Sequence, residues 1–329
     1  MILKDKSVLV TGAEGFIGSH LVEKLLSLGA NVTAMVKNNF KEDVGFLSSI
    51  PMNEENKINI CMADLNDYDA VKEITKNKDV IFHLGAEISI PYSYKHPRTF
   101  VNTNINGTLN VLMAAKEHLV KRIVIMSTSE VYGTPDNVPI KETHTLKGQS
   151  PYSATKIAAE KLAESFHLSY GLPIVIVRPF NTYGPRQSSR AIIPTLITQA
   201  LFKDKILVGN TKPTRDFNFV EDIAEGLVKV CEKDELIGEV INIGTGKEIS
   251  IGELAEKIIK LTGSRAAIET ENLRLRPEKS EIMRLCADNS KMRDKTGWTP
   301  KTDFETGLKK TIDWIKENPN HFKIGVYQI

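Results

Sequence analysis

A glycine-rich turn at residues 11–18 constrains this chain more than any other feature of its sequence. The letters TGAEGFIG stand between an apolar run, Ser7–Thr11, and a segment whose apolar residues recur at helical spacing. Gly12 permits a tight turn, Gly15 lets backbone amides approach a phosphate at the positive end of the helix, and Gly18 lets helix and strand pack closely. Strand, turn and helix together predict a dinucleotide-binding unit. We expect these residues of the turn to line its cofactor site: Gly12, Gly15, Phe16, Ile17 and Gly18.

The first half of the chain goes on alternating short apolar runs with helical patterns. Apolar runs occupy residues 31–36, 58–62, 79–84, 122–127 and 172–177, and helical patterns occupy Val101–His118 and Pro151–Tyr170. Such alternation predicts an α/β protein with a Rossmann-type, doubly wound parallel sheet covered by helices on both faces. After residue 180 the pattern is broken by proline, glycine and charged residues. We therefore expect an NAD(P)-binding domain at 1–179 and a smaller mixed α/β lobe, mainly for substrate, at 180–329. Segments such as 215–245, which contains the run VINI, are expected to return to the sheet.

Charge and cysteine content exclude several classes of function. The 329 residues include 43 basic and 41 acidic side chains, a net charge of +2, which gives no electrostatic reason to expect nucleic acid or a membrane as partner. Cys61, Cys231 and Cys286 are too few and too scattered for a disulfide framework or a metal site. With neither a leader-like N-terminus nor an apolar run long enough to span a bilayer, the sequence predicts a cytoplasmic globular protein without a metal.

A tyrosine and a lysine one helical turn apart are the candidate catalytic pair. Tyr152 and Lys156 are four residues apart and project from one face of the predicted helix. The lysine ammonium should lower the pKa of the phenol, so that the phenolate can act as a general base. Ser127–Gly133 directly follows a strand and so lies at the carboxyl edge of the sheet, where open α/β sheets bind ligands. There Thr128 can hydrogen-bond a substrate hydroxyl beside Tyr152, and Glu130 can either remove a proton from carbon or cap a turn.

The end of the second predicted strand bears on the choice of cofactor. Residues 35–39 read MVKNN and offer no carboxylate for the adenosine ribose of NAD. Lys37 could face a 2′-phosphate, which slightly favours NADP over NAD, although a solvent-exposed lysine explains the residue equally well. Asp64 and Leu65 follow the third strand, where an adenine contact would lie, and an ordinary strand-end aspartate is the alternative there.

These motifs resemble the extended short-chain dehydrogenase/reductase family, the group that modifies nucleotide sugars. The likeness covers nearly the whole chain, and beyond the turn and the Tyr–Lys pair it rests on the segments His83–Ala86, Asn104–Thr108, Arg178–Pro185, Arg215–Phe217, Asn242–Gly244 and Gly297–Trp298. The resemblance implies a nicotinamide cofactor that stays tightly bound and is regenerated in each turnover. It also implies cofactor contacts by Leu84, Gly85, Ala86, Asn104 and Pro179, together with Tyr152 and Lys156.

The same resemblance implies a nucleotide diphosphate site and a dimer. The residues expected to bind the diphosphate are Asn181, Ile193, Pro194, Arg215 and Arg276. Arginine suits this role because its forked, permanently charged donors match phosphate, although surface ion pairing would explain either arginine alone. Family members commonly form homodimers through a four-helix bundle. The candidates are Val101–His118 and Pro151–Tyr170, unless the apolar faces of these helices only cover the sheet.

Within the family, Thr128-Ser129-Glu130 resembles the catalytic stretch of the 4,6-dehydratases. The dTDP-glucose enzymes carry Asp where Ser129 stands, as the acid that protonates the departing 6-hydroxyl. GDP-mannose dehydratases and UDP-glucuronate decarboxylases carry Thr-Ser-Glu, so here Glu130 itself could deliver that proton. Together with residues 148–153, 178–186 and 276–280, this stretch most resembles the C5-retaining NDP-N-acetylglucosamine 4,6-dehydratases of nonulosonic acid and diamino-sugar pathways. The expected substrate is therefore UDP- or GDP-linked N-acetylglucosamine.

Three other functions fit parts of the pattern. A UDP-glucuronate decarboxylase would use the same oxidation at C4 but would need an arginine for the substrate carboxylate. A 4-epimerase needs only Tyr152 and Lys156, which leaves Glu130 without a task. A cofactor-binding sensor or scaffold is the alternative outside enzymes, because a fold alone does not prove activity.

Overall fold

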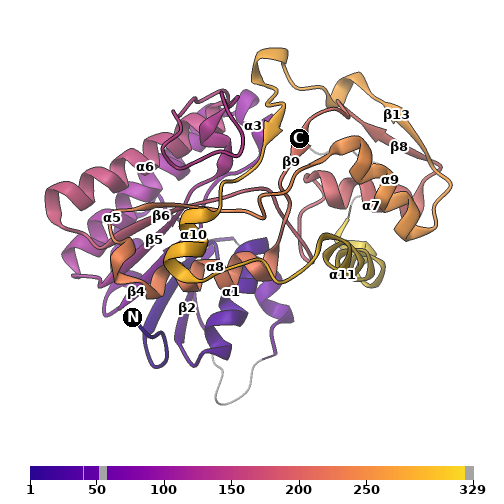
Figure 1. The fold of residues 1–329 in the computed structure, drawn as a ribbon. Helices are drawn as coiled ribbons and strands as arrows, with labels where there is room; N and C mark the ends of the chain where they lie inside the picture. Colours follow the sequence, from indigo (N-terminus) through magenta and orange to yellow (C-terminus); the bar gives the residue numbers. More distant parts are fainter. Residues whose placement is uncertain (40, 52–57, 323–329) are drawn as a thin grey trace.

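Seven parallel strands form the central sheet of the computed structural model, which describes residues 1–39, 41–51 and 58–322. The strands are β1 (Ser7–Thr11), β2 (Asn31–Lys37), β3 (Asn59–Ala63), β4 (Val80–His83), β5 (Arg122–Met126), β6 (Ile174–Pro179) and β11 (Val240–Ile243). Their spatial order is β11-β6-β5-β4-β1-β2-β3, and every neighbouring pair is parallel (Figure 1). Apart from β11, this is the 3-2-1-4-5-6 order of a doubly wound sheet, which confirms the predicted Rossmann-type fold.

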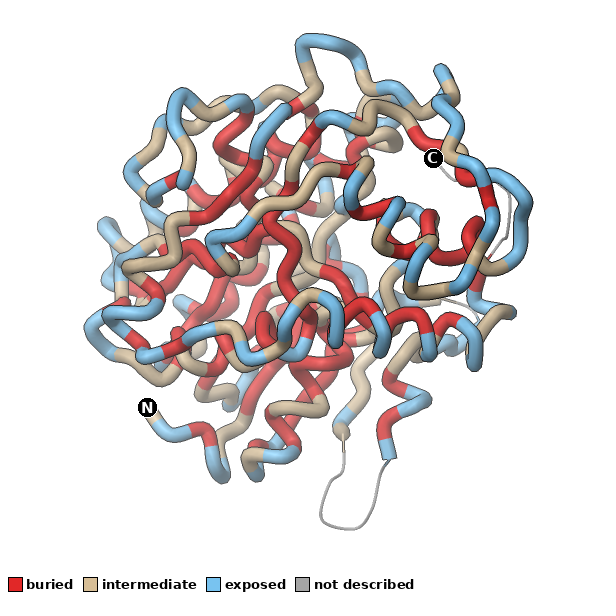
Figure 2. The backbone as a smooth tube through the Cα atoms, turned by 45° about the vertical axis from the view of Figure 1, so that its right-hand side comes forward, coloured by how far each residue is buried: buried red, intermediate tan, exposed pale blue. Residues whose placement is uncertain are grey.

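Helices cover both faces of this sheet. On one face α1 (Phe16–Ser27) packs against α8 (Val220–Glu232), and on the other lie α2 (Tyr68–Thr75), α5 (Gly107–Glu117) and α6 (Pro151–Tyr170). Side chains alternate between the two faces along each strand. Val8 and Val10 therefore belong to the core between the sheet and α1 and α8, and Leu9 belongs to the core between the sheet and α2, α5 and α6. Figure 2 shows most of these strands buried along most of their length, which is why they read as continuous apolar runs in the sequence; the edge strand β3 is the exception, since only Ala63 is buried there.

The segment between β4 and α5 is less regular than the sequence pattern predicts. It consists of α3 (Ile90–Lys95), α4 (Pro97–Phe100) and a π-helical turn, η2 (Val101–Asn106). The single helix expected over residues 101–118 is therefore a π-helical turn followed by α5. In contrast, α6 spans the predicted range; Ser150 caps its first turn and Gly171, with φ +70°, ends it.

A smaller mixed α/β lobe follows β6. Its helices are α7 (Ile192–Phe202), α9 (Ile251–Thr262) and α11 (Phe304–Glu317), which enclose a core of their own that includes Leu196, Leu254 and Leu308. Its short strands are β7 (Thr182–Tyr183) paired with β10 (Asn218–Phe219), β8 (Lys205–Val208) paired with β13 (Ala267–Thr270), and β12 (Ile249–Ser250), β9 (Thr214–Arg215) and β14 (Arg284–Leu285) in one sheet.

The chain returns from this lobe to the main sheet and leaves it again. α8 covers one face of the sheet. β11 pairs with β6, from Val240 opposite Ile176 to Ile243 opposite Pro179, and α10 (Ser290–Thr296) packs against α8 and β11. Within residues 215–245, α8 and β11 lie on the main sheet, whereas Arg215 lies on β9 in the lobe. Within the described ranges, no helix is long and apolar enough to cross a membrane.

Candidate active site

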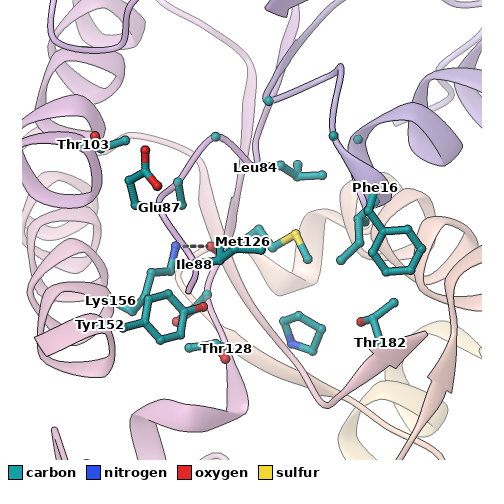
Figure 3. Close-up of a pocket in the computed structure, with 18 of the residues that line it drawn as sticks. Phe16, Leu84, Glu87, Ile88, Thr103, Met126, Thr128, Tyr152, Lys156 and Thr182 are labelled. Carbon is teal, nitrogen blue, oxygen red and sulfur yellow. Dashed lines mark hydrogen bonds between the residues drawn. The ribbon is translucent and has the colours of Figure 1, made fainter. Parts of the chain in front are cut away.

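A cavity of about 500 Å³ opens where the parallel strands end, between the sheet and the smaller lobe. It lies above β1 and β4, the point at which the strand order reverses and at which doubly wound sheets bind ligands. The predicted residues that line it are Gly12, Gly15, Phe16, Ile17, Gly18, Lys37, Asp64, Leu65, Leu84, Gly85, Ala86, Thr128, Ser129, Glu130, Tyr152, Lys156, Pro179, Asn181 and Arg276. Figure 3 shows Phe16 and Thr182 at one side of this cavity and Tyr152 and Lys156, both on α6, at the other.

The glycine turn packs as closely as its spacing predicts. A Cβ atom on Gly12, whose φ is +66°, would lie 2.8 Å from the Cα of Gly85, and one on Gly18 would lie 2.1 Å from the carbonyl oxygen of Gly12. The turn therefore has no space for side chains at either position. Because α1 begins at Phe16, its free backbone amides point toward the cavity and form a cradle suited to a pyrophosphate.

The ends of α6 and β5 place the catalytic pair. Ser150 accepts a hydrogen bond from the amide of Ser153, so α6 starts at Pro151 and carries Tyr152 and Lys156 on successive turns. Lys156 Nζ donates to the carbonyl oxygen of Met126 at 2.6 Å (Figure 3). Both side chains are buried, and the exposed fractions of Tyr152 and Lys156 are 7% and 6%.

Burial dominates the ionisation of this pair and reverses one expectation. Desolvation raises the pKa of Tyr152 above its ordinary value; the Thr128 hydroxyl opposes this shift and the Glu130 charge adds to it. The net shift of the Tyr152 pKa is therefore opposite in direction to the lowering expected from Lys156. Desolvation also lowers the pKa of Lys156, to about 8, against a smaller opposing effect of Glu160. The site thus holds a phenol that needs further positive charge to ionise.

Glu130 lies among arginines rather than in a turn cap. The cap of η3 (Ser129–Tyr132) is Thr128, whose Oγ1 accepts a hydrogen bond from the Glu130 amide at 3.2 Å. The Glu130 carboxylate is left to face the cavity, with its Oε1 3.9 Å from Nη1 of Arg276. Arg215 stands behind this pair: Glu130 raises its pKa, and burial, the larger effect, lowers it. The alternative that Glu130 merely caps a turn is therefore wrong.

The end of the cavity near β2 and the glycine turn carries more negative charge than the sequence pattern indicates. Lys37 Nζ pairs with Oε1 of Glu87 at 3.2 Å, and the backbone amide of Lys37 donates to Oε1 of Glu14 at 2.9 Å. The lysine on which the preference for NADP rests is therefore engaged by a carboxylate. Asp64 accepts hydrogen bonds from the amide and side chain of Asn66, so it also holds the turn after β3.

Four predicted binding residues do not line the cavity. Asn104 is buried beside it, where its side chain accepts from the amide of Glu87 at 2.8 Å and donates to the Glu87 carbonyl at 3.0 Å. These two hydrogen bonds fix the loop after β4. Ile193 and Pro194 are buried in the first turn of α7, with Ile193 in the core of the lobe. Arg215 is buried next to the residues that line the cavity, with its Nη2 3.5 Å from Oε1 of Glu281.

Several cavity residues escaped sequence reasoning. Glu14 and Glu87 stand inside or next to recognised motifs, and their charge was the signal that could have identified them. Thr103 and Gln187 also line the cavity, and no sequence feature singles them out. Met126 contributes through its backbone carbonyl, which binds Lys156, so its side-chain type carries no signal.

Buried polar atoms without partners show what the cavity suits. Ser127 Oγ, Asn181 Oδ1 and Arg276 Nη1 are buried and form no hydrogen bond within the part of the chain that the structure describes. Such atoms are rare in native proteins unless a ligand or water satisfies them. Together with the amide cradle and the Tyr–Lys pair, they fit a nicotinamide dinucleotide beside a polar, anionic substrate.

This combination of sheet, glycine turn and Tyr–Lys pair defines a member of the extended short-chain dehydrogenases/reductases that modify nucleotide sugars. More closely, residues 9–311 match the sequence model of the family described as GDP-mannose 4,6 dehydratase, and the chain belongs to this family.

Relatives with comparable likeness to this chain have different activities. The UDP-N-acetyl-alpha-D-glucosaminuronate decarboxylase of Bacillus cytotoxicus is 35% identical over 96% of this chain and 99% of its own. The solved UDP-N-acetylglucosamine 4-epimerase from Methanobrevibacter ruminantium, in complex with UDP-N-acetylmuramic acid, is 34% identical with a TM-score of 0.86, over 95% of this chain and 99% of that one. The dTDP-glucose 4,6-dehydratase of Streptomyces venezuelae, solved with NAD bound, is 27% identical with a TM-score of 0.89, over 96% of this chain and 99% of its own. Homology therefore gives nucleotide-sugar chemistry, and the site must distinguish the reactions.

Proposed function

We propose that this chain is a nucleotide-sugar 4,6-dehydratase that converts UDP- or GDP-linked N-acetylglucosamine to the 4-keto-6-deoxy sugar. The observation that carries this proposal is the position of Glu130. Its carboxylate faces the cavity close enough to Tyr152 to influence its pKa. A 4-epimerase has to move only the proton of a hydroxyl and a hydride, for which Tyr152 and Lys156 suffice. A carboxylate at this place supplies the base that a dehydration also requires.

Each residue of the site has its own role in the proposed reaction. Tyr152, with Thr128 beside it, takes the proton of the sugar 4-hydroxyl. When bound, a nicotinamide dinucleotide would supply a positive charge near the phenol, an acceptor for the C4 hydride and the donor that returns this hydride to C6. The ketone at C4 makes the C5 hydrogen acidic, because the resulting carbanion is an enolate. Glu130 removes that proton and, once protonated, can donate it to the departing 6-hydroxyl, so that water leaves from C6. After the hydride is added at C6, the enolate takes a proton from solvent at C5, and Tyr152 releases the proton of the 4-hydroxyl to solvent. Holding these groups together is mostly a matter of positioning.

Arg276 supports a second candidate function. An arginine beside Glu130 could instead bind the carboxylate of a uronic acid, and the 4-keto derivative of such a sugar, a β-keto acid, loses carbon dioxide readily. The Bacillus cytotoxicus relative is described as a decarboxylase of this kind. The 3.9 Å between Arg276 and Glu130 favours the dehydratase, because the two charges offset each other and leave less net positive charge for a substrate carboxylate.

Incubation with candidate substrates in deuterated water separates the reactions. Purified protein is given UDP-N-acetylglucosamine, GDP-N-acetylglucosamine or UDP-N-acetylglucosaminuronic acid, and products are read by mass spectrometry and proton NMR. We expect one of the first two sugars to lose one water and gain deuterium at C5. An unchanged mass with inverted C4 would indicate an epimerase, and loss of carbon dioxide from the third sugar would indicate the decarboxylase.

The Glu130→Gln variant tests the role of the carboxylate. It should still reduce the bound nicotinamide when the sugar is added, but water loss should fall by roughly 10²–10⁴-fold, the usual contribution of a general acid–base group. Glu164→Gln, on the exposed side of the same α6 helix that carries Tyr152, is the matched control and should keep full activity. Undiminished dehydration by Glu130→Gln would remove this residue from the mechanism.

We further propose that the enzyme is a homodimer and that the lobe after residue 179 mainly holds the nucleotide sugar. α5 and α6 carry partly exposed apolar side chains, including Met113 and Leu168, which suit a four-helix bundle between two copies. Sedimentation velocity of the wild type and of a Met113→Glu/Leu168→Glu variant tests the dimer, since the variant should sediment as a monomer. A wild-type monomer at micromolar concentration would overturn it.

A further inference from the structure

The end of the cavity formed by the β1 turn and β2 contains an arrangement that the proposed reaction does not use. Doubly wound proteins that bind NAD normally hold the adenosine ribose with a carboxylate after β2. Here that position is Lys37, followed by two asparagines. The Glu14 side chain, from the glycine turn, reaches the same place, since its Oε1 accepts the backbone amide of Lys37 at 2.9 Å.

Glu14 has unused hydrogen-bonding capacity at this position. Its Oε2 is buried and has no hydrogen-bond partner within the described part of the chain, although the residue lines the cavity. A buried carboxylate oxygen without a donor is unfavourable unless an occupant supplies one. The vicinal hydroxyls of a ribose are donors of the required kind.

The neighbouring lysine does not compensate for this charge. Lys37 Nζ forms its ion pair with Glu87, on the loop after β4, and this loop is fixed by Asn104. In the described residues, Glu14 takes part in no ion pair. Two carboxylates and one ammonium therefore surround the position of the ribose, and a 2′-phosphate with nearly two negative charges would be repelled there.

We propose that Glu14 makes this enzyme select NAD over NADP, by accepting hydrogen bonds from the adenosine ribose hydroxyls and by excluding a 2′-phosphate. The proposal rests on the proposed function only in that the cavity holds a nicotinamide dinucleotide, and it is independent of which sugar reacts. It replaces the slight preference for NADP that Lys37 suggested from the sequence.

Competition between the two nucleotides tests the assignment without any turnover. The protein is equilibrated with equal concentrations of NAD and NADP, freed of unbound nucleotide by rapid desalting and denatured, and the released nucleotides are quantified by mass spectrometry. We expect the wild type to release NAD in at least about tenfold excess. Glu14→Gln, which keeps the shape and an acceptor for the Lys37 amide, should shift the ratio toward NADP by roughly 10- to 100-fold, the value of one charge-assisted hydrogen bond.

Two further variants separate Glu14 from Lys37. Lys37→Met should lower the already small NADP share only slightly, because this ammonium is paired with Glu87, whereas a fall in that share by roughly tenfold or more would mean that the lysine binds a 2′-phosphate. Glu73→Gln, on the exposed side of α2, removes the same charge away from the cavity and should behave as the wild type. An excess of NADP in the wild type, an unchanged ratio in Glu14→Gln, or binding of neither nucleotide would overturn the proposal. If NAD is selected but no sugar is dehydrated, only the proposed reaction fails.

Discussion

Replacing Lys156 with methionine should remove a pH dependence that this lysine imposes on the stability of the protein. The side chain is 6% exposed, and burial lowers its pKa from 10.5 to about 8. An unfolded chain therefore binds more protons than the folded one between these two values. Stability consequently rises with pH through this window, and it is lowest where the buried ammonium is fully charged.

The size of the effect follows from the two pKa values. For a group that titrates near 8 when folded and near 10.5 when unfolded, linkage gives a gain on the order of 1 kcal/mol in the free energy of unfolding between pH 7 and pH 9. Methionine fills a similar volume and carries no charge, so the variant should lack this gain. Other titrating groups are common to both proteins, and their contributions cancel in the comparison.

Urea denaturation of both proteins at pH 7 and pH 9 measures this difference. The control is Lys161→Met on the same helix, since Lys161 is exposed and pairs with Glu164 at the surface. It should show the wild-type pH dependence. The reasoning would be refuted if Lys156→Met gained as much stability between pH 7 and pH 9 as the wild type, because the lysine would then keep its ordinary pKa in the fold.

Three other predictions concern buried groups. Arg178→Met should lower the free energy of unfolding by about 3–5 kcal/mol in urea denaturation, because it leaves the buried Glu160 carboxylate without its bidentate partner. Replacing Glu160 with methionine in the same variant should restore much of the lost stability. Gly18→Ala should abolish nucleotide retention or prevent folding, since the new Cβ would lie 2.1 Å from the carbonyl oxygen of Gly12, and the nucleotide released on denaturation reports it. Burial lowers the pKa of His83 to about 3, so its imidazole NMR signals should not titrate between pH 5 and pH 8, and the stability that the neutral ring supports should be lost as the pH falls below 6.5.

The fold could be predicted from sequence to the extent that burial on both faces leaves a continuous apolar run. β1 and β11 have the predicted bounds because each is covered on two sides and is bordered by polar or turn residues. α6 was predictable because Ser150, Pro151 and Gly171 mark its ends in the sequence. The π-helical turn Val101–Asn106 was not, because an i→i+5 hydrogen bond leaves no distinct periodicity over so short a segment.

The candidate catalytic residues that line the cavity could be singled out from the sequence, but their electrostatics could not. The expected effect of Lys156 on Tyr152 neglected desolvation, which depends on the helices and loops that cover α6. The ion pair between Lys37 and Glu87 joins residues 50 positions apart, and no local pattern reports such a contact. Asn104 was recognised as a motif residue, yet only its hydrogen bonds to Glu87 show that it holds in place the loop after β4, which lines the cavity.

The return of α8 and β11 to the main sheet has a consequence for recombination between relatives. Because the chain leaves the lobe after β10, completes the sheet with β11 and re-enters the lobe at β12, no single crossover point separates the two parts. A chimera that exchanged everything after β6 would import a foreign edge strand and the foreign helices α8 and α10 into the sheet, against cores they did not evolve with. Exchanging the lobe alone between relatives therefore requires at least two separate segments, one that ends before α8 and one that begins after β11, and it must leave α10 in place.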